Sequence, residues 1–372
     1  MPNFSRADNS LLGRWWWTVD RWTLGAIGLL ISIGFVMMQA ASPAVAERIG
    51  TSRDLFIVKQ IFFLVLAGSV VVGVSLLSPR NIKRLAIVGC LAALGLTIAT
   101  MMVGVEIKGA RRWISLPGMT IQPSEFLKPC FAVVAAWLIA EGRRTRRFPG
   151  MLTAFGVFGL ILMLLKSQPD IGMLAVVTVV FLAQLYIGGL HIVFIGFGVG
   201  LIAAGAVTAY TFFPHVRSRF EKFWDGTGDH YQVDTAMEAF GNGGLLGRGP
   251  GEGRVKDVLP DAHADFVFAV TGEEFGMLVC LVILLIFGFI VLRGLLRLLK
   301  EHDPFIVLSC TGLVTGFGLQ AFVNMASTMA LIPTKGMTLP FISYGGSSAI
   351  AVALGMGMLL GLTRRRNRED AP

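Results

Sequence analysis

Long apolar stretches recur along almost the whole chain, and they constrain its fold more than any other feature. A helix needs about 20 residues to cross the hydrocarbon core of a bilayer. Because 54% of the 372 residues are hydrophobic and only 15% are charged, we expect an all-α polytopic membrane protein with about ten transmembrane helices. The candidate spans are 23–42, 55–77, 85–104, 124–141, 151–165, 171–187, 192–213, 266–292, 305–330 and 347–362.

The distribution of Lys and Arg predicts the orientation of these spans, because cytoplasmic loops carry an excess of both residues. The strongest short basic clusters are SPRNIKR (78–84), GRRTRRFPG (142–150) and the RRRNR tail. They fall on one side when both termini are cytoplasmic, with 1–22 and 363–372 as the cytoplasmic ends. We therefore expect one transmembrane domain over 1–372, with short basic inner loops.

This orientation places the loops that are richest in polar sequence on the outer face. One of them, 214–265, is a large outer loop between the predicted helices 7 and 8, too long for a mere connector. The chemistry of the chain is therefore expected at the outer leaflet. The other outer loops are 105–122, 166–170 and 331–346.

Three other classes of protein or site are not supported. The net charge of +9 is explained by basic cytoplasmic loops, so no nucleic-acid partner is expected. The cysteines lie singly in apolar runs, which favours neither a disulfide framework nor a zinc site. The first apolar run lasts about 20 residues and is expected to be a span and not a removed signal peptide.

The first outer loop combines cations with an aromatic ring. Lys108 and Arg112 lie beside Trp113, whose ring suits the headgroup level of a membrane. Glu125 occupies the first turn of the next helix, and Lys128 lies three residues later on the same face. The pattern fits a substrate site, and it also fits a capped helix with an interfacial anchor and a local ion pair.

The long outer loop has two unusual segments. FFPHVRSRFEKFW (212–224) interleaves aromatic and basic residues, which suits a helix lying in the membrane interface. Gly241–Gly253 is rich in glycine, so its backbone N–H groups could approach a phosphate. Plain flexibility explains the glycines equally well.

The stretch LPDAHADFVFAVTGEEFG (259–276) brings carboxylates to a membrane boundary. Asp265 stands where the span begins, near water, and is expected to act as a general base. Asp261, four residues earlier, would share a helical face with it and has no firm assignment. Glu273 would lie about 12 Å deeper along a continuous helix. Buried charges need partners, so we expect Glu273 and Glu274 to bond to neighbouring helices and hold the bundle together.

The last outer loop, LIPTKGMTLPFISYGGSS (331–348), contains prolines and glycines that forbid a continuous helix. Irregular backbone at membrane depth is tolerated where it lines a cavity. Lys335 and Tyr344 add a cation and a hydroxyl, and Gln320 and Asn324 form an inward polar stripe on the preceding span. Cations beside such a cavity suit an anionic lipid-linked substrate, and one carboxylate base suits glycosyl or acyl transfer.

Four separated motifs carry a family resemblance. KGARRW, IQPSEFLK, LPDAHADFVFAVTGEEFG and LPFISYGGSS resemble, in order and spacing, the signature segments of the FtsW/RodA/SpoVE (SEDS) family. The resemblance covers nearly the whole chain and favours the division branch over RodA, which typically carries a different pair at Thr334–Lys335. Two residues depart from the family pattern, Ala264 in the HxDF tetrad and Thr120.

The resemblance implies an inverting peptidoglycan glycosyltransferase that polymerises lipid II during septal cell-wall synthesis. Asp265 would be the catalytic base toward the acceptor hydroxyl, and a Mg²⁺ or Mn²⁺ ion at the diphosphate is the one cofactor it leaves open, without a readable metal site. A lipid II flippase and a non-catalytic divisome scaffold are the alternatives. The expected substrate-binding residues are Lys108, Arg112, Trp113, Glu125, Lys128, His263, Lys335 and Tyr344.

The resemblance also implies partners and a location. The partners would be an FtsI-like class B penicillin-binding transpeptidase, other divisome membrane proteins and membrane lipids. The location would be the cytoplasmic (inner) membrane as a multi-pass protein, at the division septum. Against a flippase, the polar residues concentrate on one face, whereas alternating access needs a gate on both faces. A scaffold would leave Asp265 unexplained.

Overall fold

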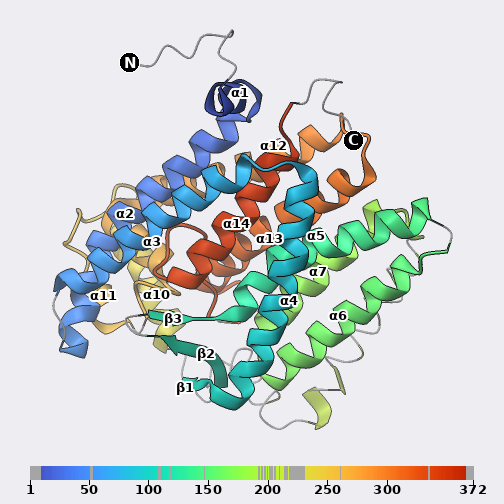
Figure 1. Cartoon of the computed structure of the whole chain (residues 1–372). Coiled ribbons are helices and arrows are strands. Elements are labelled where there is room, and N and C mark those ends of the chain that lie inside the picture. The colour runs from blue at the N-terminus through green and yellow to red at the C-terminus, as the bar shows by residue number, and fades with distance from the viewer. Residues whose placement is uncertain are drawn as a thin grey trace.

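The structure is a computed structural model of the chain (Figure 1). It describes residues 10–50, 53–107, 110–116, 119–145, 147–191, 231–259, 261–333 and 336–365, with single positions between 193 and 217. The N-terminal half contains α1 (Leu11–Thr18), α2 (Arg21–Ile49), α3 (Arg53–Ser75), α4 (Pro79–Val103), α5 (Pro123–Arg144), α6 (Gly150–Ser167) and α7 (Ile171–Ile187). The C-terminal half contains α10 (Tyr231–Gly243), α11 (Val255–Val258), α12 (Val267–Leu298), α13 (Pro304–Thr328) and α14 (Gly346–Leu362).

The helices confirm the predicted polytopic membrane fold. In the described residues, seven helices are long and apolar enough to cross a membrane, namely α2, α3, α4, α5, α6, α12 and α13. The helices α7 and α14 are apolar but shorter, with 17 residues each. The predicted span 192–213 and the amphipathic segment 212–224 lie mostly outside the described residues, so the count of ten remains a prediction.

Local sequence signals explain where several of these helices begin. Ser78 accepts a hydrogen bond from Asn81 N at the start of α4, and Pro79 follows it. Asp303 and Pro304 start α13 in the same way. Such caps satisfy backbone N–H groups that have no partner inside the helix, and proline suits the first helical position.

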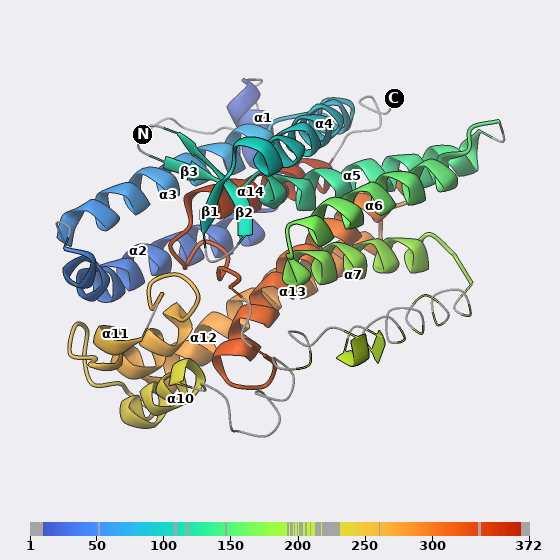
Figure 2. The same ribbon diagram turned by 90° about the horizontal axis from the view of Figure 1, so that it is seen from below.

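The interior of the bundle is formed by α5, α13 and α14, each of which has buried residues along most of its length. Of the apolar window of each helix, 78% is buried in α5 and 61% in α13, against 28% in α3, α6 and α12. Figures 1 and 2 show α5, α13 and α14 between α2 and α3 on one side and α6 and α7 on the other. Polar residues on α5 and α13 are therefore held inside the protein, away from lipid.

The predicted inner and outer segments gather at opposite ends of the bundle. At one end, Trp15 Nε1 donates to Ser75 Oγ (2.8 Å), Arg293 binds Asp20 (2.7 Å), and Arg297 Nη1 donates to the Thr363 carbonyl (2.9 Å). Helix α1 and the segment that follows α14 lie at this end, and the β-strands, α10 and α11 lie toward the other (Figure 1). The topology as a whole stays a prediction, and the cytoplasmic side is assigned from the basic residues.

The first outer loop adds a small sheet to the all-α fold that the sequence predicts. Strands β1 (Val105–Ile107), β2 (Ala110–Leu116) and β3 (Met119–Ile121) form an antiparallel sheet in the order β1-β2-β3. Val105 pairs with Trp113, and Ser115 pairs with Thr120. The sheet fixes the segment that leads into α5.

A break in α12 corrects the prediction of one continuous span over 266–292. Gly276 has φ 82° and ψ 173°, which is not helical. In a straight helix, Phe268 and Cys280 would lie about 18 Å apart along the axis. Here Cys280 Sγ lies 3.8 Å from the Phe268 carbonyl. The short segment 267–275 therefore folds back against the long segment 277–298.

Candidate active site

Asp265 lies in the turn that enters the short segment of α12. Its N–H, like that of Ala264, donates to the Asp261 carbonyl (3.0 and 2.9 Å), and Asp261 has φ 52°. The turn is thus a compact one and not the helix that would put Asp261 and Asp265 on a shared face. Asp265 is partly exposed, so its carboxylate can reach a ligand from the outer end of the bundle.

The last outer loop passes directly beside this carboxylate. A Cβ atom added to Gly336 would lie 3.1 Å from Asp265 Oδ2. From α13, the buried Asn324 Nδ2 donates to the carbonyls of both Asp265 (3.0 Å) and Met337 (2.6 Å). One amide group therefore ties the Asp265 turn to the last loop, which confirms that the predicted stripe of Gln320 and Asn324 faces inward.

His263 and Tyr344 form an aromatic wall next to Asp265. Their ring centroids are 5.0 Å apart, and Phe56 lies 5.4 Å from His263 and 5.3 Å from Tyr344. The Tyr344 N–H donates to the His263 carbonyl (2.9 Å). Burial lowers the pKa of His263 to about 4, although Asp261 acts in the opposite direction, and burial raises the pKa of Tyr344. Both side chains are therefore neutral near pH 7, and neither adds charge to the site.

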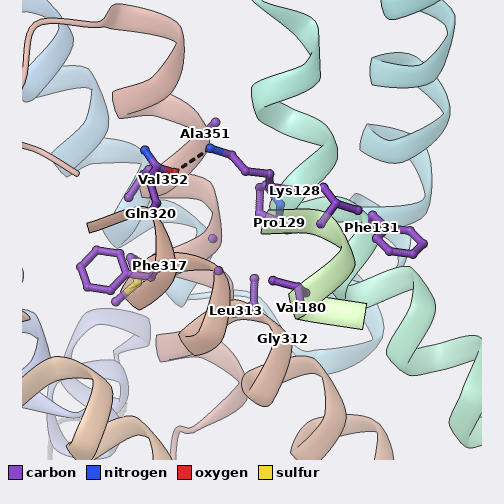
Figure 3. Close-up of a pocket in the computed structure, with 14 residues that line it drawn as sticks. Lys128, Pro129, Phe131, Val180, Gly312, Leu313, Phe317, Gln320, Ala351 and Val352 are labelled. Carbon is purple, nitrogen blue, oxygen red and sulfur yellow. Dashed lines mark hydrogen bonds between the residues drawn. The ribbon is translucent and has the colours of Figure 1, made fainter. Parts of the chain in front are cut away.

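A buried polar network joins α5 to the same last loop. Lys128 Nζ lies 2.7 Å from Glu125 Oε2 and donates to Gln320 Oε1 (2.6 Å; Figure 3). Gln320 Nε2 in turn donates to the Thr338 carbonyl (3.0 Å). The predicted ion pair between Glu125 and Lys128 is confirmed, and both residues are only 9% exposed. A charged pair with this burial is stable only with further hydrogen bonds, which Gln320 supplies.

The network and the Asp265 turn share one helix. Gln320 and Asn324 are four residues apart on α13, which is about 6 Å along the axis. Lys128 therefore binds α13 about one turn away from the residue that holds Asp265. Below Lys128, a small cavity of ≈ 40 Å³ lies between α5, α7, α13 and α14. Figure 3 shows its largely apolar lining, which includes Phe131, Val180, Leu313, Phe317 and Val352.

Arg112 binds backbone carbonyls of the corner between α6 and α7. Its Nε donates to the Gln168 carbonyl (2.7 Å) and its Nη2 to the Pro169 carbonyl (2.6 Å), while Nη1 lies 3.5 Å from Asp170 Oδ2. The side chain keeps 26% of its surface exposed. Arg112 thus holds strand β2 onto this corner and retains an exposed face. Trp113 is partly buried in the sheet, and Lys108 and Lys335 lie outside the described residues.

The buried carboxylates of α12 bind a different part of the protein from the one predicted. Glu273 accepts hydrogen bonds from Arg254 N and Val255 N (3.0 Å each). Glu274 accepts one from Gly251 N (2.7 Å) and pairs with Lys256 Nζ (2.6 Å). Their partners therefore lie at the end of the glycine-rich loop (Gly241–Gly253) and at the start of α11, and not in neighbouring spans. The Gly251 N–H belongs to the segment Gly241–Gly253 that the sequence offers to a phosphate, and here it binds one of the protein's own carboxylates.

Some residues of the site were not anticipated from the sequence. Asp170 caps α7 by accepting from Met173 N (3.2 Å), a role that its place before an apolar run could have signalled. Thr338 and Ser348 share a 2.7 Å hydrogen bond that no sequence pattern indicates.

Among the described residues, no group of three His, Cys, Asp or Glu side chains could hold a metal ion. The divalent cation at the diphosphate stays an expectation.

Comparison with protein families and curated proteins gives a consistent result. A family model described as "Cell cycle protein" (FTSW_RODA_SPOVE) matches residues 21–368. A probable peptidoglycan glycosyltransferase FtsW from Caulobacter vibrioides (strain NA1000 / CB15N) is 43% identical over 366 residues, covering 98% of this chain and 94% of the relative. The corresponding protein of Escherichia coli O157:H7 is 33% identical over 367 residues, covering 95% and 87%.

Solved structures show the same similarity at the level of the fold. The rod shape determining protein RodA of Thermus thermophilus has a TM-score of 0.70 and 26% identity, and the match covers 94% of this chain and 97% of RodA. A chain from a peptidoglycan synthase complex, described for its coordination of polymerization and crosslinking, has a TM-score of 0.78 and 25% identity. That match covers 93% of this chain and 97% of the other.

Proposed function

Since the chain belongs to the FtsW/RodA/SpoVE family, we propose that it is a peptidoglycan glycosyltransferase that polymerises lipid II at the outer face of the cytoplasmic membrane. The observation that carries the proposal is the convergence of separated motifs on Asp265. Asn324 binds the backbone of Asp265 and of the last loop, and Gln320 connects the same loop to Lys128. The relatives named FtsW are glycosyltransferases by name, which supports this reaction over a flippase or a scaffold.

In the proposed reaction, the Asp265 carboxylate accepts the proton of the 4-hydroxyl of the acceptor sugar. The oxygen forms a bond to the anomeric carbon of the donor, and the bond from that carbon to the diphosphate breaks with inversion. Undecaprenyl diphosphate leaves with the bonding electron pair, and Asp265 later returns its proton to water. A positioned base contributes about 10²–10⁴-fold in rate. The partial exposure of Asp265 supports this role, because both hydroxyl and water must reach it.

Cationic side chains would stabilise the charge that develops on the leaving diphosphate. Lys128 is held in place by Glu125 and Gln320, and Arg112 keeps an exposed face above the corner of α6 and α7. Lys108 and Lys335 are the further candidates from the sequence. A bound Mg²⁺ or Mn²⁺ would supply additional positive charge at the diphosphate. The neutral rings of His263 and Tyr344 suit contact with sugar or lipid without competing for that charge.

The cellular role that we propose is septal synthesis in the inner membrane. The partner would be an FtsI-like class B penicillin-binding transpeptidase together with other divisome proteins. Two observations support this role, the FtsW names of the relatives and the likeness to a chain of a peptidoglycan synthase complex. The coarser statement, that the chain is a multi-pass membrane protein, rests on its apolar helices and its RodA-like fold.

Reconstitution with lipid II tests the reaction directly. The purified chain, with a partner transpeptidase supplied, should produce glycan strands, and Asp265→Ala should lower the rate by at least 10²-fold while folding normally. Asp234→Asn is the matched control, because Asp234 is an exposed carboxylate of α10 at the same end of the molecule. Wild-type rates in Asp265→Ala would refute the assignment, and leaflet exchange of lipid II without glycan would indicate a flippase instead.

A further inference from the structure

Two buried carboxylates accept hydrogen bonds from the turn between the glycine-rich loop and α11. The N–H groups of Gly251, Arg254 and Val255 all point at Glu273 and Glu274. Convergent N–H groups in such turns bind phosphates and other anions in many proteins. Here the anions are the side chains of the protein itself, and both have 0% side-chain exposure. The turn therefore has an internal ligand.

The charge of this pair is compensated locally. Lys256 Nζ lies 2.6 Å from Glu274 Oε1, and the Lys256 side chain is 9% exposed. It also donates to the Gly251 carbonyl (2.9 Å). Arg248 Nη1 lies 3.6 Å from Glu273 Oε1. Buried carboxylates persist when opposite charges and hydrogen bonds satisfy them, so the loop and the carboxylates depend on each other.

The backbone of the loop also completes the break in α12. The carbonyls of Glu273 and Glu274 accept from Arg248 N (2.9 Å) and Gly249 N (3.0 Å), and Met277 N donates to the Gly244 carbonyl (3.0 Å). An added Cβ at Gly253 would lie 2.8 Å from Glu274 Cγ and 2.9 Å from Glu273 Oε2. Glycine is thus needed where the loop meets the two side chains.

We call the contacts of Glu273 and Glu274 with residues 248–256 the clamp. The clamp closes the segment that carries Asp265. The bond from Val255 N to Glu273 joins residues 18 positions apart, and Asp265 lies between them. Leu259, Ala262 and Phe266 from the same segment are buried in a small core with Ala236 and Ala239 of α10. Both ends of the segment are therefore fixed by the carboxylate pair, and its middle is fixed by this core.

We propose that Glu273 and Glu274 are positioning residues, which hold the glycine-rich loop and thereby orient Asp265 for the proposed reaction. The inference rests on the proposed role of Asp265 as base. A glutamine in place of either glutamate keeps the volume but turns one acceptor into a donor that faces N–H groups. The segment 251–265 would loosen, and a displacement of the base by about 1 Å can lower a rate about 10²-fold.

The test compares Glu273→Gln and Glu274→Gln with Glu252→Gln, in the full chain reconstituted with lipid II. Glu252 is an exposed carboxylate of the same loop, so it controls for the loss of a charge there. We expect kcat to fall at least 10-fold in the first two variants with KM changed less than twofold, and wild-type values in Glu252→Gln. Gly253→Ala should give the same defect without removing any charge, which covers the case that a glutamine variant does not fold.

Hydrogen–deuterium exchange provides the second readout, independent of activity. Amides of 251–265 should exchange faster in the clamp variants than in Glu252→Gln, while those of the sheet at 110–121 stay unchanged. Wild-type kcat in folded Glu273→Gln and Glu274→Gln would overturn the proposal, even if their stability falls. If Asp265→Ala instead retains activity, the proposed function fails, and the exchange data still report whether the clamp exists.

Discussion

Asn324 shows how a single side chain can determine the geometry of the site. It is completely buried, and its amide reaches two carbonyls that belong to segments more than 70 residues apart in sequence, Asp265 and Met337. A buried carbonyl without a donor costs about 1–3 kcal/mol. Asn324 therefore satisfies two such groups and at the same time sets the distance between the Asp265 turn and the last loop.

His263 makes the stability of this site depend on pH. Its pKa is lowered from 6.5 to about 4 by burial, so the unfolded chain binds the proton more readily than the folded one. The contribution of His263 to the free energy of unfolding is fully present above about pH 6.5 and decreases as the pH drops toward 4. It levels off below that pH, with a total loss of about 3 kcal/mol. Thermal unfolding between pH 7 and 4 should show a steeper decline for the wild-type chain than for His263→Gln.

The exposed His302, at the other end of the molecule, provides the control for this titration. His302→Gln should follow the wild-type curve at every pH. Parallel curves for the wild-type chain and His263→Gln would contradict the prediction, because they would mean that the imidazole titrates equally in both states.

At the scale of elements, the break in α12 is the feature that organises the outer end. Gly276 combines a positive φ with close contacts, since an added Cβ would meet the Leu245 carbonyl and Gly247 N. We expect Gly276→Ala to lower thermal stability and to abolish polymerisation, because the short segment could no longer fold back with the glycine-rich loop attached.

Gly288 is the matched control in the same helix. It has helical geometry, and nothing lies within 4 Å of an added Cβ. Gly288→Ala should keep wild-type activity and raise the unfolding temperature slightly, because alanine favours a helix over glycine by up to about 1 kcal/mol. If Gly276→Ala keeps the same activity as Gly288→Ala, the break in α12 is not required for polymerisation.

These elements also show what a sequence can and cannot predict. The length of the apolar runs predicts most of the helices that the structure describes. Spacings of three and four residues predict the Glu125–Lys128 pair and the inward face of Gln320 and Asn324. The break at Gly276 was missed because one glycine in an apolar run looks like part of a helix. The prediction for Glu273 and Glu274 is wrong, because their partners lie about 20 residues earlier in the chain, in the glycine-rich loop and at the start of α11. No periodic pattern in the sequence encodes that pairing.

At the scale of the whole molecule, the two ends of the bundle have different chemistry. One end carries ion pairs that join the link between α1 and α2 to α12, with Arg293 and Arg297 both bound to Asp20. The other end carries Asp265, the aromatic wall and the glycine-rich loop. A polymerase of lipid-linked sugars needs its site at the leaflet where the glycan grows, so the orientation of the bundle is part of the function.

Cysteine labelling in intact cells tests this orientation. The native cysteines Cys90, Cys130, Cys280 and Cys310 are buried, so they should give little background with a membrane-impermeant maleimide. Glu252 in the glycine-rich loop and Lys300 after α12 are both exposed, and they lie at opposite ends of the long α12 segment. We expect Glu252→Cys to be labelled from outside and Lys300→Cys to be labelled only after the membrane is permeabilised. The reverse pattern would place Asp265 on the cytoplasmic side, where it could not extend glycan strands outside the membrane.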